Sequence, residues 1–325
     1  MNIIDIADGE IINAPGVYRI SMAWYHSQCC AGPSVSSSGL RKIYNESPYA
    51  FWWQSEFNPD RPEKTESPAL ALGKAAHALI LGEDHFDSMF AFLPEDAPRR
   101  PTATQVAAFE RDGEWSKAAA AGADFWTKWD EANAGKTIIT GDMVRKIRRM
   151  AANINDNPAA VEVLRGSLTE LCLIWQDEQT GVWLKSRIDH IPDNGADYAD
   201  LTTFAPQTKE LKRAVHRAIT DNDYPMQMGL AQIGSRIVLG TEATDCVLVM
   251  AQSTEPHCVL PIRLDEEVLY WARTRVRSAI NTFAECLKAD HWPQPVEGLM
   301  EYTIPPSLTE KFEEMQRNGE LPSME

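Results

Sequence analysis

The sequence predicts an α/β protein in which helices flank a central mixed sheet. Three observations carry this prediction. A group of three strand-like segments lies in the middle of the chain, two helical segments separate it from two further strands, and a long amphipathic helix follows. Helical segments also precede the first strands, and this order is typical of helices packed on a mixed sheet. The 325 residues, 44% hydrophobic and 24% charged, have the composition of a globular protein.

Two helices are well marked in the first half of the chain. Residues 68–82 (PALALGKAAHALILG) begin with Pro and end with Gly, and their small and apolar side chains suit a tightly packed helix. Residues 140–155 begin at Thr140, a favourable N-cap. Their apolar side chains recur at helical spacing, at Val144, Ile147, Ala151 and Ile154.

The strands fall into two groups. Residues 171–176 and 182–191 predict two strands joined by the turn DEQTG, and 197–203 predict a third strand after the turn PDNG. The most regular helix is 266–288, which follows an Asp265 cap and repeats its apolar residues at intervals of three and four. The remaining elements are helices at about 206–220 and 225–238 and strands at 245–251 and 257–263.

The connecting segments are short enough to be loops within one domain. Four of them lack periodicity, namely 26–38, 58–68, 94–102 and the tail after Pro305. The start, MNIIDIADGEII, lacks the basic region and apolar core of a secretory signal. No stretch approaches the roughly 18 apolar residues that a membrane helix needs. We therefore expect a cytoplasmic protein without a membrane partner.

Cysteine usage and charge limit the function classes. The six cysteines, at 29, 30, 172, 246, 258 and 286, form no CxxC pair, so we expect buried thiols rather than a zinc site or disulfides. An iron–sulfur cluster on four of them is the alternative. The net charge of −16 disfavours binding of nucleic acid by bulk charge. A metal-binding acidic pocket and an enclosed basic channel remain compatible with it.

The segment KSRIDHIPDNGADYADLT carries the most chemical information. Side chains alternate along a strand, so Lys185, Arg187 and Asp189 share one face. Asp200 follows eleven residues after Asp189 and comes beside it on the next strand. Two converging carboxylates repel each other unless a cation lies between them, and oxygen ligands select Mg²⁺ or Mn²⁺. The alternative for two aspartates near a turn is a cap and a solvated turn residue.

The same segment resembles the PD-(D/E)xK core of the exonuclease VIII (RecE) group, with lambda exonuclease as a more distant relative. The matching part is Asp189, ten residues, and then Asp200. Other stretches match the family in order over about residues 20–295: SSSGLRKIYNESPYAF, ALALGKAAHALIL, HFDSMFAFLP, NDYPMQMGLAQIG and VLYWARTRVRSAINTFAECLKADHWPQP. The resemblance implies a restriction-endonuclease-like fold and a metal-dependent nuclease.

Carried over by position, the resemblance implies a metal site. Asp189 and Asp200 would be ligands, together with the backbone carbonyl of Leu201. His77, in the small-residue helix, would be a third side-chain ligand or its support; without the resemblance, a histidine satisfied inside a helical core is the alternative. Glu170 opens the preceding strand and is either a carboxylate for a second ion or a solvated strand-end residue.

Further positions match or depart from the family. Tyr224 and Gln227 fill its Tyr-x-x-Gln helix and would support the site or bind DNA, whereas its frequent tyrosine four residues later is Ala231 here. The domain scheme that follows is a single nuclease-like domain over 1–305 and a tail over 306–325. Within the domain, a helical part covers about 1–165, the catalytic core about 166–263 and a C-terminal helix about 265–290.

The motif lysine is missing. The family reads Asp-x-Lys, but Thr202 stands at the lysine position, and a hydroxyl cannot supply positive charge. Lost charge of this kind costs on the order of a hundredfold or more in rate. Lys185 is one replacement, about 13 Å along the strand from Asp189 at 3.3 Å per residue. Arg187 is closer and cannot act as a base, though it could clamp a phosphate.

Two functional hypotheses follow. The first is a Mg²⁺-dependent exonuclease that resects double-stranded DNA ends. The resemblance implies 5′→3′ polarity, a ring-like homo-oligomer, and a single-strand annealing protein as partner in phage-type recombination in the bacterial cytoplasm. The second is a pseudonuclease that binds DNA or protein but cleaves slowly or not at all. Two basic helical clusters either track a phosphate backbone or form solvated faces: Arg145, Lys146, Arg148 and Arg149, and Lys209, Lys212, Arg213 and Arg217.

Overall fold

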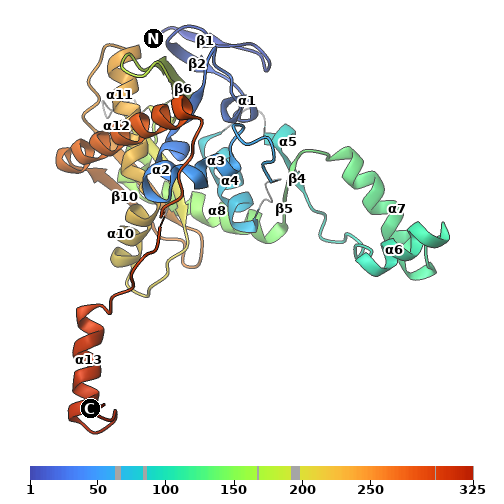
Figure 1. Cartoon of the computed structure of the whole chain (residues 1–325). Helices are drawn as coiled ribbons and strands as arrows, with labels where there is room; N and C mark the ends of the chain where they lie inside the picture. The colour runs from blue at the N-terminus through green and yellow to red at the C-terminus, as the bar shows by residue number, and fades with distance from the viewer. Residues whose placement is uncertain (63–66, 83–85, 167, 192–197, 297, 325) are drawn as a thin grey trace.

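The computed structural model describes residues 1–62, 67–82, 86–166, 168–191, 198–296 and 298–324. Its centre is an eight-stranded mixed sheet in the order β1-β2-β6-β7-β8-β9-β10, with β3 also paired to β7 (Figure 1). The strands are β1 Ile3–Asp5, β2 Gly16–Arg19, β3 Ser34–Ser36, β6 Leu168–Gln176, β7 Trp183–Ile191, β8 Tyr198–Phe204, β9 Cys246–Gln252 and β10 Val259–Leu264. A separate parallel pair joins β4 (Phe90–Phe92) to β5 (Thr137–Ile139).

Helices cover both faces of the sheet. The larger core cluster packs one face of β6, β7 and β9 against α2, α10, α11 and α12. A second cluster packs the alternate residues of β8 and β9 against α4, α8 and α9. The helices are α2 Ser37–Asn45, α4 Pro68–Leu81, α8 Gly141–Asn155, α9 Pro158–Val163, α10 Leu211–Asn222, α11 Tyr224–Val238 and α12 Glu266–Ala289.

The remaining helices lie around this body. α6 and α7 project from it on the side of α5, and α13 stands at the end of an extended C-terminal segment (Figure 1). Their bounds are α1 Met22–His26, α3 Pro48–Gln54, α5 Phe86–Met89, α6 Ala103–Asp112, α7 Lys117–Ala132 and α13 Pro306–Arg317. None of the helices in the described part of the chain combines the length and apolar character that crossing a bilayer requires.

The predicted mixed sheet with flanking helices is confirmed, and several boundaries are corrected. The N-terminal part was expected to be helical, yet β1, β2 and β3 belong to the central sheet. Residues 26–38, expected as a loop, contain β3 and the start of α2, because Ser34–Ser36 pair in parallel with Trp183–Lys185 of β7. The expected tail contains α13, which begins with Pro306 at its first turn. The PDNG turn lies outside the described residues.

Candidate metal centre

Helix α4 brings His77 to the sheet. Its N-cap is Ser67, and it ends at Gly82, whose φ of 73° is the left-handed conformation that glycine adopts most easily. Gly73 allows a close approach to β8, because a Cβ there would lie 3.1 Å from Thr203 Oγ1. His77 is four residues further along and therefore on the same side of the helix. The small residues of the helix thus place an imidazole next to the strands.

Strands β6 and β7 bring two carboxylates together. They are antiparallel, and their register pairs Leu171 with Ile188. One residue further along, Glu170 lies opposite Asp189. The backbone of Glu170 has φ of 58°, a left-handed conformation that costs a residue other than glycine about 1 kcal/mol or more. Like charges in directly opposite positions of a ladder also destabilise it. Both features indicate a local arrangement that the sheet alone does not favour.

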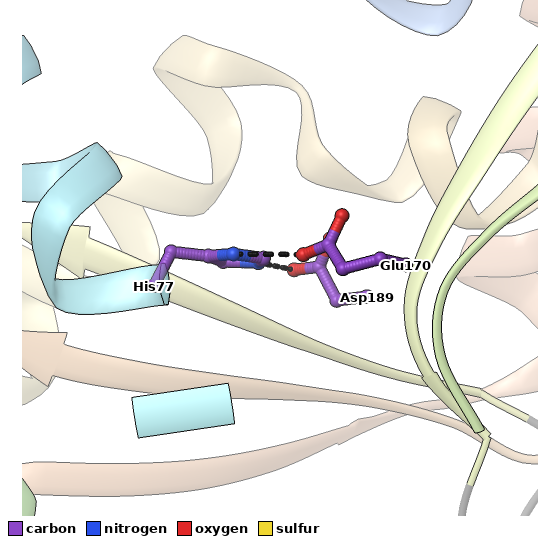
Figure 2. Close-up of side chains that lie close together, drawn as sticks. All are labelled: His77, Glu170 and Asp189. Carbon is purple, nitrogen blue, oxygen red and sulfur yellow. Dashed lines mark ion pairs between the residues drawn. The ribbon is translucent and has the colours of Figure 1, made fainter. Parts of the chain in front are cut away.

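The ring of His77 lies between these carboxylates. Its Nδ1 is 2.9 Å from Glu170 Oε1, and its Nε2 is 2.9 Å from Asp189 Oδ2. Figure 2 shows the ring pointing from α4 toward both acids. The side chains are 19%, 11% and 13% exposed for His77, Glu170 and Asp189 respectively. One donor atom from each residue falls within 4.8 Å of the others, so a single cation could contact all three.

Asp200 completes the acidic group from β8. It is 4% exposed and forms a hydrogen bond with Asp189. Its Oδ1 accepts a hydrogen bond of 2.6 Å from Gln227 Nε2, and its Oδ2 accepts one of 2.7 Å from Thr202 Oγ1. The backbone N–H of Leu201 donates to Asp189 Oδ2 at 3.1 Å. The two aspartates are therefore held in one arrangement by neighbours from β8 and α11.

The two aspartates differ in proton affinity. Burial raises the pKa of Asp200 well above its ordinary value, and the charge of Asp189 raises it further. Burial also acts to raise the pKa of Asp189, but the charge of His77 and hydrogen bonds from His77, Asp200 and Leu201 lower it overall. Without a cation, Asp189 is the ionised member and Asp200 the protonated one. A divalent ion would take the place of this proton.

The donor set fits a hard divalent cation. Two carboxylates that share one proton, a third carboxylate and an imidazole are chemically suited to Mg²⁺ or Mn²⁺. The structure brings His77, Glu170 and Asp189 together as possible ligands, and Asp200 forms a hydrogen bond with Asp189 beside them. The assignment of Asp189, Asp200 and His77 as the ligands stays a prediction. The sequence left Glu170 open between a ligand and a solvated residue; its exposure of 11% excludes the solvated alternative. The metal role of the Leu201 carbonyl stays a prediction.

Two predicted support residues lie beside this group. Burial raises the pKa of Tyr224, and the charge of Asp200 raises it further. The guanidinium of Arg41 lies over the Tyr224 ring at 5.7 Å, a neighbour that the sequence did not indicate. The Arg187 Nε contacts Glu170 Oε2, and its Nη1 donates to the Ile20 carbonyl at 3.3 Å.

The structure does not place Lys185 at the carboxylates, which corrects the expectation that it replaces the motif lysine. Lys185 is 2% exposed, and its Nζ donates to the carbonyls of Tyr25 at 2.7 Å and Ser27 at 2.6 Å. The reason is that β7 pairs with β3 at this end, so the segment after α1 covers the side chain. Burial lowers the pKa of Lys185. Its ammonium group thus connects the N-terminal segment to the sheet.

The cysteines also lie in the interior. Five of the six free cysteines are buried and Cys258 is partly buried. Cys29 and Cys30 lie near Lys185, and their sulfurs are 3.9 Å apart. A hydrogen bond from Cys30 and the charge of Lys185 lower the pKa of Cys29 to about 7, although burial opposes them. The cluster of possible ligands that the described residues form is His77, Glu170 and Asp189, and it contains no thiol.

Comparisons with known proteins agree with this geometry. The family described as "PDDEXK-like domain of unknown function (DUF3799)" matches residues 36–304. The crystal structure described as "Putative exonuclease" from Eubacterium rectale, at 2.19 Å resolution, aligns with a TM-score of 0.51 and 14% identity, covering 87% of this chain and 92% of that chain. No curated protein matches. The predicted restriction-endonuclease-like fold is therefore confirmed.

Proposed function

The chain belongs to the PDDEXK-like family of unknown function DUF3799, and we propose that it is a metal-dependent nuclease that cleaves DNA. The observation that carries the proposal is the His77 ring held between Glu170 and Asp189, beside the proton-sharing pair of Asp189 and Asp200. Four buried or nearly buried polar side chains, from α4, β6, β7 and β8, meet at one point. Buried acidic groups at such density are costly unless a cation compensates them.

The residues of this site have distinct roles in the proposal. Asp189 and Asp200 hold the ion, and His77 supports it from α4. Gln227 and Thr202 orient Asp200 through their hydrogen bonds. A bound divalent ion supplies an activated water and neutralises charge that develops on the scissile phosphate. The sequence resemblance extends the proposal to Mg²⁺ or Mn²⁺ as the ion.

The resemblance to the exonuclease VIII group also supports a substrate and a setting. We propose that the substrate is an end of double-stranded DNA, resected with 5′→3′ polarity. The same resemblance supports a homo-oligomer that acts with a single-strand annealing protein in phage-type recombination. These finer statements rest on the ordered motif segments between residues 20 and 295.

A pseudonuclease is the second candidate, and Thr202 favours it. The hydroxyl of Thr202 donates to Asp200 at the position where the family carries a lysine. Lys185 is bonded to backbone carbonyls, and the guanidinium of Arg187 is paired with Glu170. Neither cation is therefore directed to a phosphate in this structure. In this reading the site binds metal and DNA but lacks the charge that accelerates hydrolysis.

Digestion of linear duplex DNA labelled at its 5′ ends tests the two candidates. The protein is incubated with Mg²⁺ or Mn²⁺ beside an Asp200→Ala control, and closed circular DNA of the same length serves as a substrate without ends. Metal-dependent release of label from linear DNA alone, lost in the control, supports the exonuclease. If no cleavage occurs at high protein concentration while DNA or metal binding is retained, the nuclease activity is excluded and the pseudonuclease is supported.

A further inference from the structure

Helix α10 connects two of the elements that form the metal centre, β8 and α11. It follows β8, whose Asp200 lies near the start of that strand, and it leads directly into α11, whose Gln227 donates to Asp200. The C-terminal residue of α10, Asn222, is five residues before Gln227, so this end of the helix leads into the metal centre. Its N-terminal end lies about 18 Å away, since its 12 residues each rise about 1.5 Å.

The two sides of α10 differ sharply. Ala214 and Val215 are 3% and 1% exposed and belong to the main core. The opposite side is exposed and basic. It carries a set that we call the α10 basic face, namely Lys209 just before the helix and Lys212, Arg213 and Arg217 within it.

The α10 basic face differs from the other charged helix surfaces of this protein. On α7 and α8, lysines pair with aspartates one turn away: Lys128 with Asp124 at 2.9 Å and Lys146 with Asp142 at 2.8 Å. Within the described residues, by contrast, no acidic partner is found for the first three members of the face, Lys209, Lys212 and Arg213.

The fourth member, Arg217, pairs with Asp221 at 3.2 Å, and both side chains are 56% exposed. Exposed pairs of this kind contribute little and can be exchanged for another anion. A chain of net charge −16 thus has, within the described residues, three cations without an acidic partner at the N-terminal end of the helix that leads toward its metal centre.

We propose that the α10 basic face binds the sugar–phosphate backbone of the DNA strand that leads away from the metal centre. This inference rests on the proposed function. The α10 basic face runs over residues 209–217 and is therefore about 12 Å long at a rise of about 1.5 Å per residue. A strand of duplex DNA carries one phosphate per about 3.4 Å of helix axis, so this face spans roughly three to four phosphates. Lysine and arginine suit this role, because they neutralise phosphates without reading the bases. The local face compensates for the repulsion that the acidic remainder of the molecule exerts on DNA.

The test is the salt dependence of DNA binding by the full chain. A fluorescent 20-base-pair duplex is titrated by anisotropy in Ca²⁺ over a series of KCl concentrations, and gels verify that it stays intact. The test variant combines Lys209→Gln, Lys212→Gln and Arg213→Gln. The matched control combines Lys117→Gln, Lys288→Gln and Lys311→Gln, three exposed lysines of α7, α12 and α13. Both variants change the net charge equally, and all six positions are exposed, so the fold is retained.

The outcomes separate the inference from the proposed function. We expect the test variant to bind on the order of tenfold more weakly, with a slope of log K against log salt that is less steep by about 2 to 3 units, because each lost phosphate contact removes about 0.9. The control should stay within about twofold of the unmodified protein. Equal loss in both variants overturns the inference, since bulk charge would then explain it. No DNA binding by the unmodified protein overturns both.

Discussion

Glu170 lies opposite Asp189 in the β6–β7 ladder, and the His77 ring separates their carboxylates. The distance is 2.9 Å from each ring nitrogen to its nearest carboxylate oxygen. His77 forms a hydrogen bond with Asp189, whereas Glu170 Oε1 is buried without a hydrogen-bond partner among the described residues. If the imidazole is doubly protonated, it compensates one of the two negative charges that face it. This relationship makes the stability of the protein dependent on the occupants of the site.

Removing the ring should destabilise the metal-free protein. We expect His77→Ala to lower the free energy of unfolding at pH 7 by about 1–3 kcal/mol, because Asp189 loses its hydrogen bond with the ring and the ring no longer separates the two facing carboxylates. Urea denaturation in EDTA measures the change. His216→Ala, at an exposed position of α10, is the control and should stay within about 0.5 kcal/mol of the unmodified protein. Equal effects of the two substitutions would contradict the role of the ring.

Neutralising Asp189 or Asp200 separately should have opposite effects on the stability of the metal-free protein. The pKa of Asp200 is raised in the folded protein, so stability falls as pH rises from the ordinary carboxyl range through that raised value. Asp200→Asn removes this loss and should stabilise the metal-free protein at pH 8 by about 1 kcal/mol or more. The pKa of Asp189 is lowered, so its contribution is present above the ordinary carboxyl pKa and is lost in acid.

Asp189→Asn should accordingly destabilise the protein at pH 8. The effect of Asp200→Asn should shrink toward pH 4, whereas the effect of Asp189→Asn should persist there, because the contribution of Asp189 is lost only as pH falls through its lowered pKa. Thermal unfolding of the two variants in EDTA across pH 4–8 measures this. Shifts of the same sign at pH 8 would show that the two carboxyl groups do not share a proton as the structure indicates.

Much of this site follows from local sequence patterns. The strand that carries Asp189 alternates between buried and partly buried residues over its second half, and the small-residue helix carrying His77 has a proline start and a glycine end. The position of Glu170 opposite Asp189 could also have been predicted from the sequence. A hairpin that closes by pairing Gln176 with Trp183 must bring residue 170 opposite residue 189. The left-handed backbone conformation of Glu170 could not have been predicted, because nothing in its residue type favours that conformation.

Contacts between residues distant in the sequence explain why the position of Lys185 and the strands β1, β2 and β3 were not predicted. Lys185 shares a strand face with Asp189, so alternation alone predicts a common site. Its actual contacts depend on the end of α1 and its C-cap residue, because the Tyr25 and Ser27 carbonyls that it binds lie about 160 residues away in sequence. The strands β1, β2 and β3 are only three or four residues long, too short for a periodic signal. Whether such short strands form depends on the strands with which they pair, which are distant in the chain.

Metal binding should release a proton. Asp200 is the protonated member of the pair, and a divalent ion needs its carboxylate form. We therefore expect Mn²⁺ binding near pH 7 to release up to one proton per ion and to strengthen as pH rises. Calorimetry in two buffers of different ionisation enthalpy measures the release. Asp200→Asn should abolish the buffer dependence, whereas a buffer-independent enthalpy in the unmodified protein would contradict the shared proton.

Lys185 should matter for stability and little for cleavage. Lys185→Met leaves the carbonyls of Tyr25 and Ser27 without their donor, so we expect a loss of about 2–3 kcal/mol in the free energy of unfolding. If the protein cleaves DNA, the rate of the variant, measured well below its unfolding temperature, should stay within about threefold of the rate of the unmodified protein. Lys288→Met, exposed on α12, should change neither quantity. Abolished cleavage with the fold retained would restore Lys185 as the substitute for the motif lysine.

The last prediction concerns Thr202, whose side chain lies against the carboxylate that a motif lysine would accompany. Thr202 Oγ1 is 2.7 Å from Asp200 Oδ2, so a longer side chain from the same position passes directly by the acidic pair. Thr202→Lys should raise metal-dependent cleavage of linear duplex DNA on the order of a hundredfold, because it adds a positive charge where charge develops in the transition state.

Thr202→Met is the matched control, since it extends the side chain without adding charge and should give no increase. Initial rates with excess DNA measure both variants. An increase with lysine alone shows that the rest of the site is competent and that Thr202 limits the rate. If lysine gives no increase while DNA and metal binding persist, then the defect extends beyond residue 202 and the fold serves binding rather than cleavage.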